Sequence, residues 1–428
     1  MLSVLPSEII AQIIDIVGEN NDTNLLKELA LVSHSFLQIC NKHLFATVEL
    51  HDAIPNYHAS SKKGFVKLLQ SRPDVVKYIR KLTYKVAYIY DNHYGNRYES
   101  LLLFPPNNDD HQLSPVLPNF LRTISRLNCL TITGSKLDWN TLDSSLTSAF
   151  LHLMHLPTIN HINLSFIQKF PLSSLAPCVN LHRLDIFYLN RFELEEDGLP
   201  EFVVQSEMMP NIREFRTSDS SPLTTILLHS KMQDGRPAFN FKDLRRLSMS
   251  FNVYQDELNI RYILLNAKLL VKLSLSVGSR RSLLGLHDIL SLGARTLKVL
   301  DLTVSLYNDS IPLLPLAGLC EELEAMAGHN ILEALFLDVQ VEGHETEEFI
   351  GSIIQNVEKA LVKSGWSALR QVSFKVSIAC CLVSTEVSAK LSEALQSLPD
   401  KYLSHFSKLE SFSFNYSAYI VKCAYDPD

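Results

Sequence analysis

Histidine, cysteine, serine and acidic side chains are the groups in this sequence that could act as nucleophiles, bases or metal ligands. His152 and His155 lie three residues apart in a segment expected to be helical, and this spacing would put both imidazoles on one face, as a zinc site requires. The sequence near them supplies no third ligand. Serine, histidine and aspartate are plentiful, yet there is no GxSxG nucleophile elbow and no glycine-rich phosphate loop. The sequence therefore predicts a protein that is not an enzyme and holds neither a metal nor a cofactor.

The seven cysteines are scattered and form no CxxC pair, so neither zinc binding nor dithiol chemistry is indicated. A dispersed set of odd number is typical of reduced thiols inside a cell. Cys380 and Cys381 stand in an apolar stretch, where burial would leave a thiol unreactive. The sequence starts without a basic region followed by an apolar run, and no apolar stretch reaches membrane-spanning length. We therefore expect a cytoplasmic or nuclear protein that does not bind membranes.

The charge pattern argues against nucleic-acid binding. With a formal net charge of −7, the chain lacks the excess of basic residues that neutralises phosphates. Its two adjacent arginine pairs, Arg245-Arg246 and Arg280-Arg281, are isolated and are expected to be solvated. An apolar fraction of 46% with 20% charged residues is typical of a globular protein rather than a disordered one.

The elements that would position a binding surface are clearest in the first fifty residues. A polar break contains Asp22 and Thr23, which are candidate caps for a second helix, and apolar spacing then predicts two short helices with a bend near Ser33. On a helical wheel, the segment that precedes the break gathers its aliphatic residues in one arc of about 160°. These residues are Ile9, Ile10, Ile13, Ile14, Ile16 and Val17.

Three short helices in about 45 residues lie close to the smallest size, about 40 residues, at which a domain can bury enough surface to fold alone. A stripe as wide as that of the first helix predicts that one part packs on the sister helices and another part on a different protein. The alternative is that the three helices simply cap a larger core.

The same residues resemble an F-box, in the form that is common in fungal F-box families. The pattern runs over residues 3 to 50 and comprises Leu5-Pro6-x-Glu8-Ile9-Ile10, Ile13, Ile16, Leu25, Leu29, Val32-Ser33, Phe36 and His43-Leu44-Phe45. The resemblance implies binding to the Skp adaptor of a Skp–cullin–F-box ubiquitin ligase through the Leu-Pro start and the apolar helix faces. The implied adaptor contacts are Leu5, Pro6, Ile9, Ile13, Val32 and Phe36. Many members of the family carry tryptophan where this chain has Phe36.

The remainder of the chain contains a loose internal repeat. Triples of the form LxxLxL recur at intervals of 22 to 48 residues, although about a dozen would arise by chance in so apolar a chain. The shared flanks, as in NLHRLDIF, DLRRLSMS and KLESFSFN, and the helix-like stretches 197–209, 282–294 and 346–364 between them indicate strand–helix units. The triples begin at Ile79, Leu127, Ile159, Leu181, Ile212, Leu244, Leu270, Leu297, Leu332, Leu369 and Leu409.

Repeated strand–helix units over about residues 79 to 416 resemble leucine-rich repeats. The units are longer than is usual in that family, and the asparagine expected after the strand is present only as Asn252. The resemblance implies an α/β fold, with a three-helix F-box (residues 1–50) followed by an irregular solenoid (residues 51–428). In that solenoid, a horseshoe, parallel strands would line the concave face. Polar residues in segments 90–100, 104–115, 220–225 and 232–240 predict surface loops.

Residues between the apolar positions of each triple would point away from the core and line the concave face. Those expected to contact a target protein are Arg183, Asp185, Glu214, Arg216, Arg246, Lys272, Asp301 and Asp338, with His161, Asn163, Ser248, Phe336, Gln371 and Lys375 on the same face. Together the two resemblances imply the substrate-recognition subunit of a Skp–cullin–F-box ubiquitin ligase, with a Skp-type adaptor and, through it, a cullin as partners. The alternatives are a non-degradative F-box protein and a repeat scaffold or inhibitor.

Overall fold

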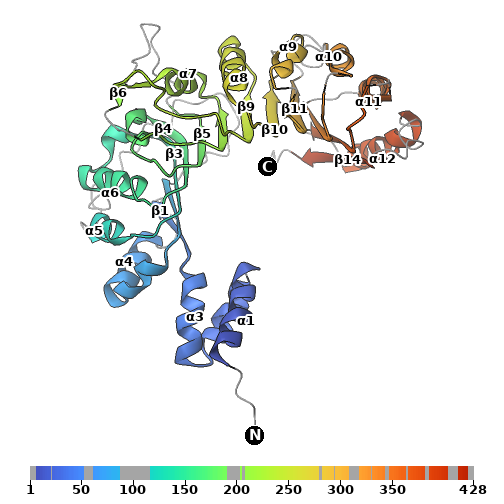
Figure 1. The fold of residues 1–428 in the computed structure, drawn as a ribbon. Helices are drawn as coiled ribbons and strands as arrows, with labels where there is room; N and C mark the ends of the chain where they lie inside the picture. The colour runs from blue at the N-terminus through green and yellow to red at the C-terminus, as the bar shows by residue number, and fades with distance from the viewer. Residues whose placement is uncertain are drawn as a thin grey trace, which may run out of the picture. The chain divides into compact units, whose positions relative to one another are not determined.

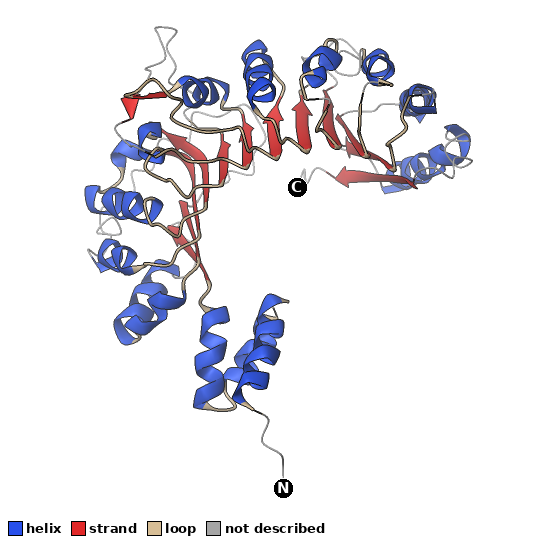
Figure 2. Ribbon diagram, viewed as in Figure 1, coloured by secondary structure: helices blue, strands red, loops and turns tan. Residues whose placement is uncertain are grey.

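The computed structural model describes residues 6–20, 22–52, 61–86, 116–189, 203–204, 208–278, 282–293, 295–307, 318–328, 330–342, 347–362, 365–380, 385–402 and 413–422. Contacts divide the chain into two units. The first comprises Met1–Pro210 and Ser230–Ala238, and the second comprises Asn211–His229 and Phe239–Asp428. Within each unit, the helices that alternate with the strands lie along one side of a layer of parallel strands (Figure 2).

The first unit starts with three helices and continues with strands and helices in alternation (Figure 1). Its strands β1 to β5 are neighbours in chain order and all pair in parallel, while β6 and β8 form a separate parallel pair. Its helices are α1 (Ser7–Glu19), α2 (Thr23–Ala30), α3 (His34–Leu44), α4 (Ser61–Ser71), α5 (Val116–Thr123) and α6 (Ser144–Met154), with 3₁₀ turns η1 (Pro73–Tyr78), η3 (Trp139–Thr141) and η4 (Leu172–Leu175). Its strands are β1 (Thr47–Asp52), β2 (Lys81–Val86), β3 (Cys129–Asp138), β4 (His161–Gln168), β5 (Arg183–Phe187), β6 (Val203–Val204) and β8 (Lys231–Met232).

The second unit repeats this plan, and its strands pair in parallel in the order β7, β9, β10, β11, β12, β13, β14. Its strands are β7 (Glu214–Ser218), β9 (Arg246–Ser250), β10 (Lys272–Val277), β11 (Val299–Tyr307), β12 (Ala334–Glu342), β13 (Gln371–Cys380) and β14 (Ser413–Lys422). Its helices are α7 (Ser221–His229), α8 (Tyr254–Asn266), α9 (Leu286–Ser291), α10 (Leu319–Met326), α11 (Glu347–Val362) and α12 (Thr385–Tyr402).

The strands arise where the triples predict them. In ten of the eleven repeats, a strand begins two residues after the first apolar residue of the triple. The alternation of apolar and polar residues then buries every second side chain, because successive residues of a strand point to opposite faces. In β4, for example, Ile162 and Leu164 are fully buried and their neighbours are half-buried. The predicted α/β class with parallel strands is confirmed.

Helices α1 to α3, here called the helical module, pack around a small core of Ile14, Leu26 and Cys40. The predicted capping of α2 is confirmed, since the Asp22 side chain accepts a hydrogen bond from the Leu25 amide at 3.0 Å. The bend near Ser33 is also confirmed: the Ser33 hydroxyl accepts from the Phe36 amide at 3.3 Å and starts α3. The predicted domain boundary at residue 50 falls within β1, which pairs with β2.

Two sequence predictions about local structure are wrong. Segment 220–225, expected to be a loop, forms the start of α7. There the hydroxyls of Thr224 and Thr225 donate to the carbonyls of Ser220 and Ser221 four residues back, so these polar residues are satisfied within the helix. In the helix-like stretch 197–209, Val203–Val204 form β6 instead, because two β-branched residues pair readily with β8.

The two other predicted helices are present, one of them shorter than expected, and some predictions fall on residues outside the described part of the chain. The helix expected over 282–294 is shorter, since α9 starts only after Gly285, whose φ of 84° suits glycine. The helix over 346–364 is present as α11. Leu5, Cys381, Arg280-Arg281 and the expected loops 90–100 and 104–115 lie outside the described residues.

Candidate functional site

The helical module carries an exposed apolar stripe on α1. Ile9, Ile13 and Ile16 follow one another at helical spacing and are 40%, 47% and 59% exposed, respectively. The other half of the predicted arc turns inward: Ile14 is fully buried, and Ile10 and Val17 pack against the core. One part of the wide stripe therefore packs on the sister helices, as the sequence predicted, and the other part is exposed.

Further exposed apolar residues lie on α2 and at the junction of α2 and α3. Leu31 and Val32 are 88% and 65% exposed, and Leu25 on α2 is 38% exposed. Leu31 was not singled out from the sequence, because it falls outside the helical spacing that joins Leu25 and Val32 to the core positions. The α1 stripe and these three residues are here called the apolar face.

The remaining predicted adaptor contacts occupy different environments. Pro6 is exposed and is the N-cap residue of α1, where its carbonyl accepts from the amides of Ile9 and Ile10 at 3.0 and 3.2 Å. Phe36 is only half-buried, and it packs against the module's core. Its ring thus serves the core at least in part.

An ion-pair cluster holds α1 against α3. The Asp15 carboxylate lies 2.5 Å from Lys42 Nζ and 2.7 Å from His43 Nε2. Burial opposes ionisation of Asp15, but the hydrogen bonds to Lys42 and His43 outweigh it and hold the pKa of Asp15 below its usual value. Beside them the backbone of Gly18 lies against the His43 ring, where any Cβ would clash. This close approach fixes the α1–α3 contact and, with it, the direction of the exposed stripe.

The predicted target-binding residues form ion pairs between neighbouring strands. In the first unit, His161 and Arg183 both bond to Asp185. In the second unit, Arg246 lies 3.1 Å from Glu214, Lys272 lies 3.4 Å from Asp301, and Lys375 lies 2.6 Å from Asp338. Arg216 is exposed on β7 between buried neighbours. Each unit therefore presents a row of paired charges on its strands, here called the polar ladder.

Aromatic rings add to the polar ladder in the second unit. The Lys272 ammonium lies 5.9 Å from the Phe336 ring centroid, and that of Lys375 lies 5.1 Å from the ring of Tyr419. Such mixed rows of charge and aromatic surface suit contacts with a folded protein better than with a small ligand.

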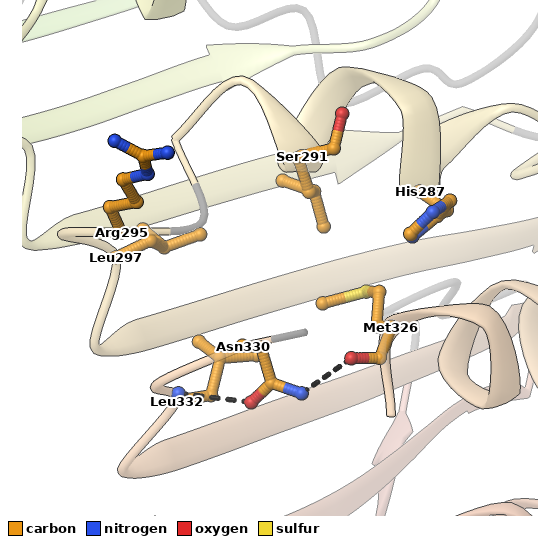
Figure 3. A pocket seen from close by; sticks show the side chains of 8 residues that line it. His287, Ser291, Arg295, Leu297, Met326, Asn330 and Leu332 are labelled. Carbon is orange, nitrogen blue, oxygen red and sulfur yellow. Dashed lines mark hydrogen bonds between the residues drawn. The ribbon is translucent and has the colours of Figure 1, made fainter. Parts of the chain in front are cut away.

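A cavity of about 360 Å³ lies in the second unit beside α9 and α10 (Figure 3). The polar groups of Asn330 and Ser291 are already satisfied, the first by the Met326 carbonyl and the Leu332 amide, the second by the Asp288 carbonyl. The Ser291 hydroxyl therefore donates to a backbone carbonyl and not to His287, which also lines the cavity. The lining residues are His287, Leu290, Ser291, Arg295, Leu297, Met326, Asn330 and Leu332.

The candidate metal pair does not gather a ligand set. His152 and His155 are both exposed, and His155 Nε2 lies 2.8 Å from the Ser174 carbonyl. Across the described part of the chain, His, Cys, Asp and Glu residues nowhere form a group of three placed to hold a metal ion. None of the helices described is both long and apolar enough to cross a bilayer.

Comparison with known proteins does not assign the chain to a family. No family model matches the sequence. A search of curated proteins finds no significant match either. The case for a function therefore rests on the apolar face and the polar ladder themselves.

Proposed function

We propose that this chain is a substrate-recognition subunit of a Skp–cullin–F-box ubiquitin ligase. In this proposal the helical module acts as an F-box and binds a Skp-type adaptor, and the strand–helix units act as irregular leucine-rich repeats that bind a target protein. The observation that carries the proposal is the apolar face, because a three-helix module with so small a core leaves large aliphatic side chains in solvent. The proposal places the protein in the cytoplasm or the nucleus, where such ligases act.

The energetics favour a partner for the apolar face. Each large aliphatic side chain gains about 1.5–3 kcal/mol when it is fully buried, and about half of that when it starts half-exposed. Ile9, Ile13 and Ile16 together would contribute several kcal/mol to a complex. Clustered exposed apolar residues of this kind are typical of protein-binding surfaces. The position of the face, on the residues that resemble an F-box, is what favours a Skp-type adaptor over another partner.

The polar ladder supports the second half of the proposal. In the chain without a target, the charges of the polar ladder are paired with one another. A target would therefore have to offer complementary charges or displace one member of a pair. This requirement favours a specific protein partner, because unmatched charges at an interface cost several kcal/mol.

The test is binding of the full-length chain to a purified Skp adaptor, measured by calorimetry. The double variant Ile9→Asp/Ile13→Asp should weaken binding by at least about 100-fold, because two aliphatic contacts are lost and two carboxylates would have to be desolvated. The matched control is Leu265→Asp, which changes an aliphatic residue that is 66% exposed on α8. This control variant should bind like the unmodified chain.

The outcomes separate the alternatives. Tight adaptor binding by a folded double variant, with its circular dichroism and melting unchanged, would contradict the F-box assignment and leave a capped repeat scaffold. If the unmodified chain binds the adaptor but a protein captured by the repeats is not turned over in a cullin-dependent way, the chain is a non-degradative F-box protein. The target would then be held but not ubiquitinated.

A further inference from the structure

Three side chains on neighbouring strands of the first unit form a relay, and the proposed function gives no role to the cysteine in it. His161 on β4 contacts both Cys129 on β3 and Asp185 on β5, the two strands that pair with β4. Its Nδ1 lies 3.1 Å from the Cys129 sulfur, and its Nε2 lies 3.0 Å from an Asp185 carboxylate oxygen. A thiol, an imidazole and a carboxylate in this order are the arrangement that activates a cysteine nucleophile.

The strand register creates the relay. Cys129 and His161 are paired positions of the parallel ladder between β3 and β4, so their side chains point to the same face. Asp185 lies two residues beyond the partner of His161 on β5 and therefore also points to that face. Arg183 also donates to the carboxylate, at 2.8 Å between its Nη2 and Asp185 Oδ2, the same oxygen that His161 contacts.

The electrostatics favour a charged imidazole. Burial by itself lowers the pKa of His161, but the hydrogen bonds with Asp185 and Cys129 outweigh it and raise the pKa to about 9. Burial likewise opposes ionisation of Asp185, yet its bonds with His161 and Arg183 keep its pKa below the usual value. At neutral pH the ring therefore carries two protons and can donate to the sulfur and the carboxylate at once.

Three other cysteines in the described part of the chain have the opposite surroundings. Cys40 and Cys178 are buried, and burial raises the pKa of both thiols, that of Cys178 to about 12. Burial and the carboxylates of Glu321 and Glu324 raise the pKa of Cys320 to about 11. Cys129 is half-buried, so a small reagent in solution can approach it.

We propose that Cys129 is a reactive thiol, activated by the neighbouring His161, which Asp185 holds in place, and that it is a modification site for small soluble electrophiles. The sulfur attacks the electrophilic atom, a bond from sulfur to that atom forms, and the leaving group departs with the electron pair of the broken bond. With iodoacetamide, a carbon–sulfur bond replaces the carbon–iodine bond and iodide is released. The thiol proton passes to solvent as the carbon–sulfur bond forms, and His161 keeps its own protons.

Two other roles fit the geometry less well. One nitrogen of His161 contacts the Cys129 sulfur and the other contacts the Asp185 carboxylate. The three groups therefore do not converge on a common point and are not a metal ligand set. Hydrolysis would need amides free to stabilise an oxyanion. Here the Cys129 amide donates to the Arg80 carbonyl at 3.1 Å, and the His161 amide donates to the Asn128 carbonyl at 3.1 Å.

The experiment is competitive labelling of the folded full-length chain with a limiting amount of iodoacetamide, read for each cysteine by peptide mass spectrometry. Cys320 is the matched reference, since it is also half-buried but lies beside carboxylates instead of an imidazole. At neutral pH, Cys129 should react at least about tenfold faster than Cys320, because a neighbouring imidazolium increases the thiolate fraction.

The variant His161→Gln can still offer a hydrogen bond to the sulfur but cannot carry a positive charge. It should slow labelling of Cys129 at least about tenfold and leave Cys320 unchanged. The unchanged Cys320 rate and an unchanged melting curve show that the fold is intact. Equal rates for Cys129 and Cys320 in the unmodified chain would overturn the proposal. So would a His161→Gln variant that is folded and labels Cys129 as fast as the unmodified chain.

Discussion

The helical module and the strand–helix units handle aliphatic residues in opposite ways. In β4, Ile162 and Leu164 are fully buried, whereas on α1 the equally apolar Ile13 and Ile16 are about half-exposed. The strands can bury every second residue because helices cover one face of the layer (Figure 2). Three short helices have no such cover. On the module, exposed large aliphatic residues therefore mark a surface that lacks a partner.

The two regions also differ in how they use charge. In the module, charges join helices, as Asp15 does between α1 and α3. On the strands, charges pair across the ladder and stay accessible: the Lys272 and Asp301 side chains are 40% and 31% exposed. Accessible pairs of this kind add little to stability, typically 0–1 kcal/mol. Their role is better sought in recognition than in folding.

The largest expected effect comes from the strand core. Leu164→Ala should lower the free energy of unfolding by about 2–5 kcal/mol, since it removes a fully buried side chain and leaves a cavity. Ile16→Ala, on the exposed stripe, should change it by less than about 0.5 kcal/mol. Urea unfolding of the two variants measures both values. If Ile16→Ala is as destabilising as Leu164→Ala, the stripe is packed in the isolated chain and the contrast between the two regions fails.

A smaller effect should appear as a dependence of stability on pH in the first unit. The pKa of His161 is raised to about 9 from its usual 6.5, so the charged ring contributes stability that is fully present below pH 6.5 and is lost as the pH rises through about 9. Unfolding free energies should therefore differ most between the unmodified chain and His161→Gln near pH 6. The difference should shrink at higher pH.

Urea titrations at several pH values between about 6 and 10 provide this measurement. The variant Lys298→Gln is the control, because it removes an exposed ion pair with Glu333, between the residues that precede β11 and β12 in the second unit. A His161→Gln difference that is the same at every pH would mean that the ring acts only through packing.

Much of the fold could be predicted from the sequence, because strand and helix periods are local. The LxxLxL triples located the strands since a buried strand needs apolar side chains at every second residue. Polar segments were less informative. The start of α7 was misread because its hydroxyls bond to the helix's own carbonyls, which composition does not reveal.

The candidate sites were only partly within reach of the sequence. The division of the α1 arc followed from helical geometry, but the full exposure of Leu31 depends on where α2 stops. The relay was missed for a different reason. Cys129 and His161 each stand two residues after the start of a triple, so their shared register was visible, but the contacts of His161 with Cys129 and with Asp185 depend on side-chain rotamers.

The smallest predicted effect concerns the N-cap of α2 and tests whether the helical module is less stable than the strands. Asp22→Ala should destabilise α2 by about 1 kcal/mol, because the Leu25 amide loses its acceptor at the helix start. The module has few buried side chains to compensate, so the loss should appear as faster hydrogen exchange across residues 22–32, while the amides of β4 keep their protection. Asp22→Asn, which retains a side-chain acceptor, should exchange nearly as slowly as the unmodified chain. Asn24→Ala changes an exposed residue two positions after Asp22 and should have no effect. If Asp22→Ala speeds exchange in β4 as much as in α2, the module and the strands unfold as one cooperative body, and the exposed face cannot be treated as the property of a separate, weakly stable module.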